Sequence, residues 1–240
     1  MDNSFVKDLK DIFDENPQIH EINGKIYSSV SLHPVEEQTR FAERITFNNL
    51  KSLVTMIKAE SAYFSLPLYI NVASFTEVNV FDSMNERLER QCPFRCVSDG
   101  SPFEFGRQYD YESFVIALRS MFVQNDDIKD LLELLQRISN VDSLETEDDG
   151  ITQRVTASSG THLSRTISAA PIRTLAPFRT FREVEQPKSD FLFRISDRNR
   201  FALYEADGGA WKLAAKNKIL DYFEFELQDE IKDGKVIVVG

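Results

Sequence analysis

Arginine and phenylalanine alternate in one short stretch of this 240-residue chain, PFRTFREVEQP at positions 177–187. Phe178 and Phe181 alternate with Arg179 and Arg182, and two glutamates follow. Guanidinium planes and aromatic rings stack on exposed bases and bind phosphate, so the pattern suits single-stranded nucleic acid. The alternative is an edge strand whose phenylalanines enter the core while its arginines pair with nearby acids. This structural interpretation is the more common outcome for such a pattern.

A second candidate follows in EADGGAW, positions 205–211. Gly208 and Gly209 precede an expected helix that opens near Trp211, and free amide groups at a helix start can hold an anion. The alternative is that Asp207 caps the helix and the glycines only make the turn. The spacing fits neither the phosphate-loop nor the dinucleotide fingerprint, and Asp207 would repel a phosphate. Arg194, in FLFRIS, completes the candidate binding set.

Residues for metal binding or catalysis are not grouped in the sequence. Cys92 and Cys96 in QCPFRC lack two further ligands for zinc, because the three histidines lie far away in sequence. The acidic run ETEDDG at 145–150 lacks the ligand spacing of a calcium loop and favours a solvated acidic loop. No nucleophile–base pair or nucleophile elbow is visible. We therefore expect no metal, no cofactor and no enzyme activity.

Charge divides the chain unevenly. The net charge is −11, yet residues 151–200 carry nine Lys and Arg and four Asp and Glu, a net charge of +5. The preceding 150 residues have a net charge of −13. An acidic chain disfavours simple binding to a phosphate backbone. The arginine-rich residues 151–200 could still bind phosphate locally. One variant is that the acidic front imitates DNA and occupies a basic host protein.

The sequence lacks a long apolar run and a basic, apolar leader, which predicts a cytoplasmic protein without a membrane span.

Apolar periodicity predicts the elements that would position the candidate residues. In the first 150 residues these are a helix at 4–15, a hairpin at Asn23–Gly24, strands at 41–47, 66–74 and 75–81, a helix at 48–60 capped by Asn48 or Asn49, an ambiguous stretch at 82–110, a helical region at 111–139 broken near 124–126, and an acidic loop or boundary at 141–150.

After residue 150 the pattern changes to a period of two. It predicts a polar hairpin around 158–160, a second hairpin from FLFRIS and RFALYEA, a helix at 210–227 and a last strand, KVIVV. The fold class is therefore α+β, with a mainly antiparallel sheet and segregated helices. We expect an acidic region at 1–145 and a region of hairpins, helix and terminal strand at 151–240, or one continuous domain.

Four segments resemble the phage and prophage family called domain of unknown function 2303, the YfdQ-like proteins. They are FEFGRQYDYESFVIALRSMFV, ETEDDGITQRVTASSG, LAPFRTFREVEQPKSDFLFRIS and ALYEADGGAWKLAAKNKI, which lie in order over roughly residues 100–227. The resemblance implies a shared fold and a viral or proviral origin in a bacterial host cell. It implies no catalytic assignment, and it suggests a setting near recombination or replication functions.

Three functional hypotheses follow. The first is a phage accessory protein that acts without catalysis by binding a phage or host protein, or nucleic acid. The second is a protein that binds single-stranded nucleic acid and supports recombination or replication. The third and weakest is a metal-dependent hydrolase or nuclease built from clustered carboxylates. Homo-oligomer formation is left open, and no membrane partner is expected.

Overall fold

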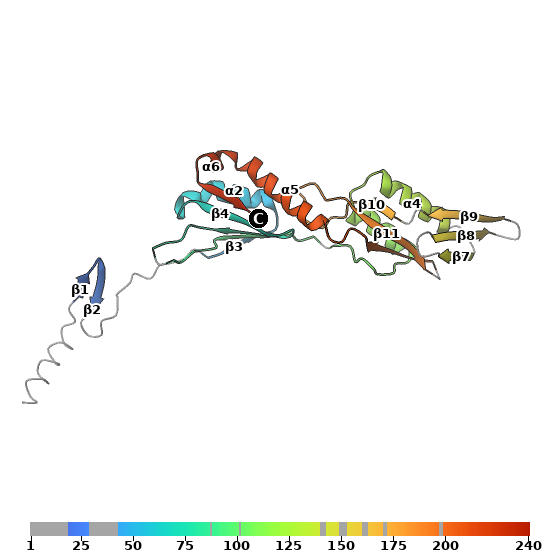
Figure 1. Cartoon of the computed structure of the whole chain (residues 1–240), viewed down its shortest axis with the longest axis horizontal. Helices are drawn as coiled ribbons and strands as arrows, with labels where there is room; N and C mark the ends of the chain where they lie inside the picture. The colour runs from blue at the N-terminus through green and yellow to red at the C-terminus, as the bar shows by residue number, and fades with distance from the viewer. Residues whose placement is uncertain are drawn as a thin grey trace, which may run out of the picture. The chain divides into compact units, whose positions relative to one another are not determined.

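The computed structural model describes residues 19–28, 43–86, 88–100, 102–139, 143–148, 153–159, 163–169, 172–196 and 199–240. The chain forms two compact units, 1–43 and 44–240 (Figure 1). In the first unit, β1 (Ile19–Ile22) and β2 (Lys25–Ser28) form the predicted hairpin. Asn23 and Gly24 both have positive φ, as its tight turn requires. The predicted helix at 4–15 lies outside the described residues.

The larger unit contains a mixed five-stranded sheet in the order β13-β4-β5-β6-β3. Its central pairs are antiparallel, whereas both edge strands run parallel to their neighbours. The strands are β3 (Ile45–Phe47), β4 (Leu68–Ser74), β5 (Glu77–Phe81), β6 (Phe94–Val97) and β13 (Val236–Val239). The parallel pairing of β13 with β4 brings the last residues of the chain beside its first third. In the ambiguous stretch at 82–110, the strand is β6.

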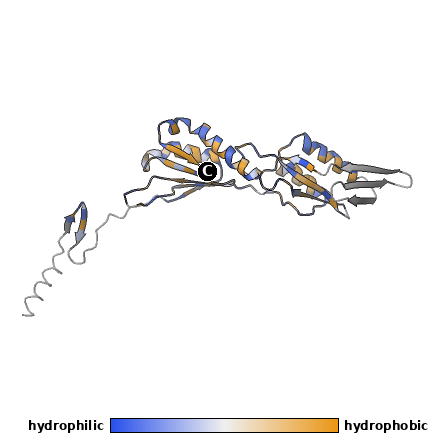
Figure 2. Ribbon diagram, viewed as in Figure 1, coloured by the Kyte–Doolittle hydropathy of each residue, from blue (hydrophilic) through white to orange (hydrophobic). Residues whose placement is uncertain are grey.

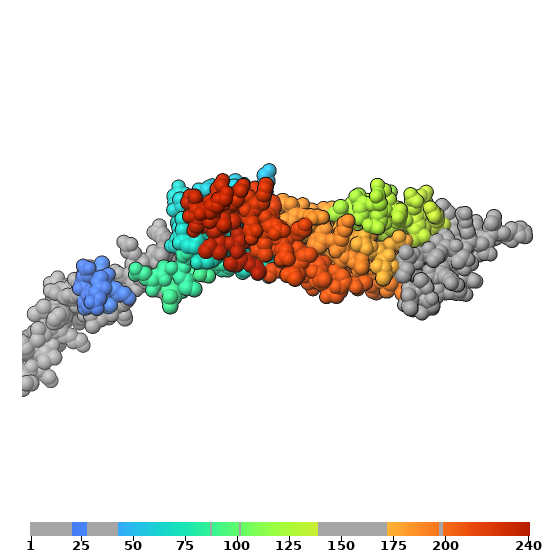
Figure 3. Space-filling model, turned by 45° about the horizontal axis from the view of Figure 1, so that its top comes forward, coloured from blue at the N-terminus to red at the C-terminus, as the bar shows by residue number. Residues whose placement is uncertain are grey.

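Helices cover one face of this sheet. They are α2 (Leu50–Glu60), α5 (Trp211–Glu226) and the short α6 (Gln228–Lys232), with a 3-10 turn, η1 (Ser61–Tyr63), after α2. The Asn49 side chain accepts a hydrogen bond from the Ser52 amide at 2.8 Å and caps α2, as predicted. In the space-filling view, the red residues of α5 and α6 lie against the cyan residues around α2 and β4 (Figure 3).

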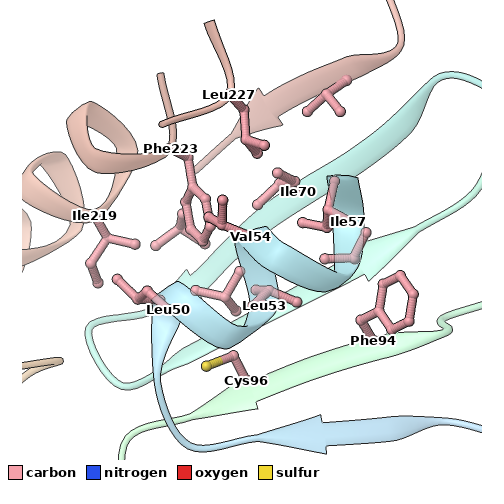
Figure 4. Packing of buried hydrophobic residues seen from close by; sticks show 14 of the residues in the cluster. Leu50, Leu53, Val54, Ile57, Ile70, Phe94, Cys96, Ile219, Phe223 and Leu227 are labelled. Carbon is pink, nitrogen blue, oxygen red and sulfur yellow. The ribbon is translucent and has the colours of Figure 1, made fainter. Parts of the chain in front are cut away.

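The apolar faces of these elements meet in what we call the first core (Figure 4). Each buried aliphatic or aromatic side chain contributes about 1.5–3 kcal/mol relative to exposure. Its buried residues are Leu50, Leu53, Val54, Ile57, Leu68, Ile70, Val72, Val78, Val80, Phe94, Cys96, Phe181, Val184, Ile219, Phe223, Leu227 and Val236.

A second core forms under a three-stranded antiparallel sheet of β10 (Ile172–Leu175), β11 (Ser189–Ser196) and β12 (Arg200–Glu205). Helices α3 (Tyr111–Met121) and α4 (Asp126–Ser139) supply its other wall, and the break between them falls at the predicted place. This second core is unusually aromatic, with Phe114, Phe193 and Phe201 stacked on one another. Along α4, apolar residues gather on the covered side and polar residues on the other, whereas α5 also exposes Leu213 and Phe225 (Figure 2).

The expected acidic loop at 141–150 is wrong as a structural prediction. Residues Ser143–Asp148 form β7, which pairs antiparallel with β8 (Gln153–Ser159), and β8 pairs with β9 (Leu163–Ala169). The register places Glu147 opposite Arg154 and Glu145 opposite Thr156. Pairing with β8 satisfies backbone amides and carbonyls along this stretch, so an acidic composition does not prevent a strand here. The polar hairpin of β8 and β9 agrees with the prediction.

The fold is α+β and mostly antiparallel, as predicted from the sequence. Residues on both sides of the expected boundary near 145–151 share the second core: Phe114 and Leu131 precede it, and Phe191 and Leu203 follow it. The compact unit 44–240 therefore runs through that position. Within the part of the chain that the structure describes, no helix is long and apolar enough to cross a membrane.

Candidate functional site

A cavity of about 310 Å³ lies where the segments linking the two cores meet the start of α5. Five aromatic residues line it, and they come from four separate stretches of the chain. They are Phe75 from the β4–β5 turn, Phe103 and Phe105 from the segment after β6, Phe178, and Trp211 at the start of α5. Three charged residues, Arg179, Glu205 and Lys212, also line its wall, together with Thr76, Ser98, Gly100 and Pro102.

Arg179 is the central polar residue of this wall, although only 6% of it is exposed. Its Nη1 donates to Oε1 of Glu205 at 3.0 Å, and its Nη2 donates to the hydroxyl of Ser189. The guanidinium carbon lies 3.8 Å from the centroid of the Trp211 ring and 5.4 Å from that of Phe191. A guanidinium held over aromatic rings is stabilised by their electron-rich faces, and more strongly when water is excluded.

Glu205 connects the arginine to the tryptophan. Its Oε1 also accepts a hydrogen bond from the indole Nε1 of Trp211 at 3.1 Å. The Glu205 side chain is 40% exposed, so the cavity reaches solvent on this side. Phe75 packs edge-on against Trp211, with ring centroids 4.6 Å apart. One carboxylate oxygen of Glu205 therefore holds both the Arg179 guanidinium and the Trp211 indole in place.

Burial lowers the pKa of the Arg179 guanidinium to about 10, because water no longer stabilises its charge. The Glu205 and Asp207 carboxylates limit this fall. At neutral pH the guanidinium still carries its proton. Its Nε is buried and has no hydrogen-bond partner among the described residues.

The turn before α5 places Trp211 in the wall. Gly208 and Gly209 have φ of 64° and 84°, a region that residues with a Cβ rarely adopt. The Asp207 carboxylate accepts from the Gly209 amide at 3.1 Å and from the Trp211 amide at 3.4 Å. These amides are already bonded within the chain, so an anion at this helix start would compete with Asp207. The N-cap of α5 is Ala210 rather than the predicted Asp207, but the Asp207 carboxylate does bond the first amide of the helix.

The stretch 177–187 is not the edge strand that we expected as its structural alternative; after an isolated bridge at Pro177 it is an irregular loop with a turn at 182–183. The buried side chain of Gln186 explains why. Its Oε1 accepts from the amides of Arg179 and Thr180, and its Nε2 donates to the carbonyls of Phe181 and Val184. Because one side chain satisfies four backbone groups, the loop is stable without a neighbouring strand.

The predicted candidates separate into three environments. Phe178, Arg179 and Trp211 meet at the cavity, and Arg182 is exposed beside it, with its guanidinium carbon 3.7 Å from the Phe178 centroid. Phe181 is buried in the first core. Arg194 lies on β11 and does not line the cavity. Sequence reasoning missed Phe75, Phe103, Phe105, Glu205 and Lys212, because separate segments bring them to the cavity.

No group of three or more His, Cys, Asp or Glu side chains that could hold a metal occurs among the residues with described positions. Cys92 is half-buried and Cys96 is fully buried, and both are free thiols. Burial raises the pKa of the Cys96 thiol to about 12, which keeps it protonated at neutral pH.

Comparison with known proteins found no matching family model, no matching curated protein and no matching solved structure. The resemblance to the phage and prophage family therefore stays a prediction from the sequence.

Proposed function

We propose that this chain is a binding protein that acts without catalysis, and that the Arg179–Trp211 cavity receives a side chain of a partner protein. The cavity carries this proposal: five aromatic rings surround a space of about 310 Å³. That volume is at the small end of ligand pockets, which span roughly 300–1,000 Å³. It suits one ring-sized group, and a single aromatic anchor in a desolvated pocket is a common centre of a protein interface.

The ionisable groups of the cavity wall, Arg179 and Glu205, support a binding function more than a catalytic one. Arg179 and Glu205 bind each other, and Glu205 also accepts from the indole of Trp211. Both groups therefore act as fixed parts of the wall that orient the rings. The metal-dependent hydrolase of the third hypothesis gains no support from the described residues.

Single-stranded nucleic acid is the alternative partner. The stacking of exposed Arg182 on Phe178 is the observation that favours it, because arginine planes also stack on bases. The burial of Arg179 argues against it, since a guanidinium that is 6% exposed and bonded to Glu205 does not reach a phosphate. A protein partner with one inserted ring is the better fit.

The biological setting in this proposal comes from the sequence resemblance alone. It is that of a phage or prophage accessory protein in the cytoplasm of a bacterial host, with a phage or host protein as the partner.

Trp211 gives a direct test because it is the only tryptophan of the chain and lines the cavity. N-acetylphenylalanine amide, titrated against the whole protein, should change the tryptophan fluorescence with a Kd of about 1 mM, as expected for a small fragment. Gly100→Phe should abolish this response. Gly100 lines the cavity, its φ is not in the left-handed region, and an added Cβ would meet only the Ser98 hydroxyl, at 3.7 Å.

A matched control places a phenylalanine elsewhere. Ser120 is exposed on α3 and does not line the cavity, so Ser120→Phe should bind the amide like the parent protein. If the parent shows no saturable response, or if Gly100→Phe responds as strongly while folding normally, the cavity is not the binding site.

A further inference from the structure

Two exposed cations flank the cavity on different segments. The Arg182 guanidinium lies over the ring of Phe178, at 3.7 Å from its centroid. The Lys212 ammonium lies 6.0 Å from the centroid of Trp211 and belongs to the cavity wall itself. Phe178 and Trp211 both line the cavity, so each cation stands next to a ring that an inserted group would touch.

These two cations have no ion pair within the described part of the chain. Among the same residues, the adjacent Glu183 accepts only a 3.4 Å hydrogen bond from the Lys51 amide, and three other nearby acids are bonded elsewhere. Glu205 binds Arg179, and Asp207 binds backbone amides at the start of α5. Glu185 pairs with Lys218 at 2.7 Å. The cavity wall and the exposed residues beside it therefore combine one internally neutralised pair with Arg182 and Lys212, which have no ion pair among the described residues.

We propose that the partner segment is an acidic peptide, with one aromatic side chain that enters the cavity and Asp or Glu residues on either side of it. This inference rests on the proposed function and adds the charge of the partner. The ring would replace water against the aromatic walls, and the flanking carboxylates would reach Arg182 and Lys212. Complementary charge of this kind increases the association rate and selects among partners.

The distribution of charge favours a peptide over single-stranded nucleic acid. Binding a nucleic-acid backbone needs a series of cations along a groove, one for each neutralised phosphate. Among the described residues, the exposed cations beside the cavity rings are Arg182 and Lys212, and the protein as a whole carries a net charge of −11. Two carboxylates beside one ring match this arrangement, whereas a longer polyanion would also meet the acidic remainder of the surface.

The test compares three synthetic peptides, each with a central phenylalanine and no tryptophan: one flanked by glutamates, one by serines and one by lysines. Binding to the full chain is measured by Trp211 fluorescence at low and high salt. The glutamate peptide should bind about 5- to 10-fold more tightly than the serine peptide at low salt. This advantage should disappear at high salt, because exposed charges are screened.

The charge-reversed variant Arg182→Glu/Lys212→Glu should lose the preference for the glutamate peptide and bind the lysine peptide better. Its affinity for the serine peptide should change less than its affinity for the glutamate peptide. The matched control, Lys58→Glu/Lys216→Glu, changes the net charge equally at two positions outside the cavity lining and should keep the parent preference. Thermal unfolding of each variant shows that it is folded.

The outcomes separate the two proposals. Equal binding of the glutamate and serine peptides, or a preference that persists in Arg182→Glu/Lys212→Glu, would contradict the proposal of an acidic partner. It would not contradict the proposal that the cavity binds an aromatic side chain. No response to any peptide or to N-acetylphenylalanine amide overturns the pocket itself. A labelled oligothymidylate provides the remaining comparison. If it binds more tightly than the glutamate peptide and loses affinity in the same double variant, Arg182 and Lys212 bind nucleic acid and the proposal of a peptide partner is wrong.

Discussion

The guanidinium carbon of Arg179 lies 3.8 Å from the centroid of the Trp211 ring, and both side chains donate to the same oxygen of Glu205. Arg179 comes from an irregular loop and Trp211 from the start of α5, with 31 residues between them. Their contact therefore joins this loop to α5, together with the ion pair between Glu185 and Lys218. Because Trp211 is the only tryptophan of the sequence, its fluorescence should report a change in the position of Arg179.

Arg179→Ala should lower the free energy of unfolding by about 2–4 kcal/mol, because it removes a buried cation together with its hydrogen bonds and ring contacts. Arg182→Ala should cost no more than about 1 kcal/mol, since its guanidinium stacks on Phe178 in the exposed loop. Urea denaturation followed by far-UV circular dichroism measures both. Equal effects of the two substitutions would contradict the separation of a structural arginine from an exposed one. Nucleic-acid binding is therefore best tested with Arg182 alone.

Gln186→Ala should destabilise the protein by about 2–4 kcal/mol, although glutamine is usually a surface residue. Its removal leaves the amides of Arg179 and Thr180 and the carbonyls of Phe181 and Val184 without their partner. Glu185→Ala, one residue earlier and exposed, should change stability by less than about 1 kcal/mol. A small effect of Gln186→Ala in the same denaturation experiment would show that the loop has another source of stability.

The two thiols should react at different rates. Cys96 is fully buried and the pKa of its thiol is raised to about 12, so in Cys92→Ser its labelling by a disulfide reagent at pH 8 should follow global unfolding. In Cys96→Ser, the half-buried Cys92 should react faster from the native state. Mild urea should accelerate Cys96 more than Cys92. Fast labelling of Cys96 without denaturant would mean that the first core opens locally.

Stability should depend on Glu77 below pH 5. Hydrogen bonds from Arg95 and Asn79 hold the pKa of this carboxyl below its ordinary 4.5 in the folded state. The folded protein therefore binds fewer protons than the unfolded chain near pH 4. The stabilisation is present in full above the unfolded pKa and is lost as the pH falls through the folded one. Glu77→Gln should flatten the pH dependence of the urea midpoint between about pH 5 and 3. A slope equal to that of the parent would show that the Arg95 pair does not contribute.

Local patterns of the sequence predicted much of the secondary structure. Leu50, Leu53, Val54 and Ile57 recur at helical spacing and are all buried on α2. Val78 and Val80 alternate with polar residues on β5 and are also buried. These signals succeed because the period of an apolar face is a local property of the backbone. They fail where a partner is distant: the acidic stretch of β7 is stabilised by its pairing with β8.

The sequence by itself determined the α+β class, most element positions and the presence of an unusual cluster of arginines and phenylalanines. It also placed Phe178, Arg179 and Trp211 among the candidates. Only the tertiary structure decided that Arg179 turns inward while Arg182 remains exposed, and that Phe75, Phe103 and Glu205 join the same cavity. The physical reason is that neighbouring arginines have the same local propensities. Their roles diverge because Gln186 holds the loop and Glu205, at the end of β12, provides a carboxylate for one of them only.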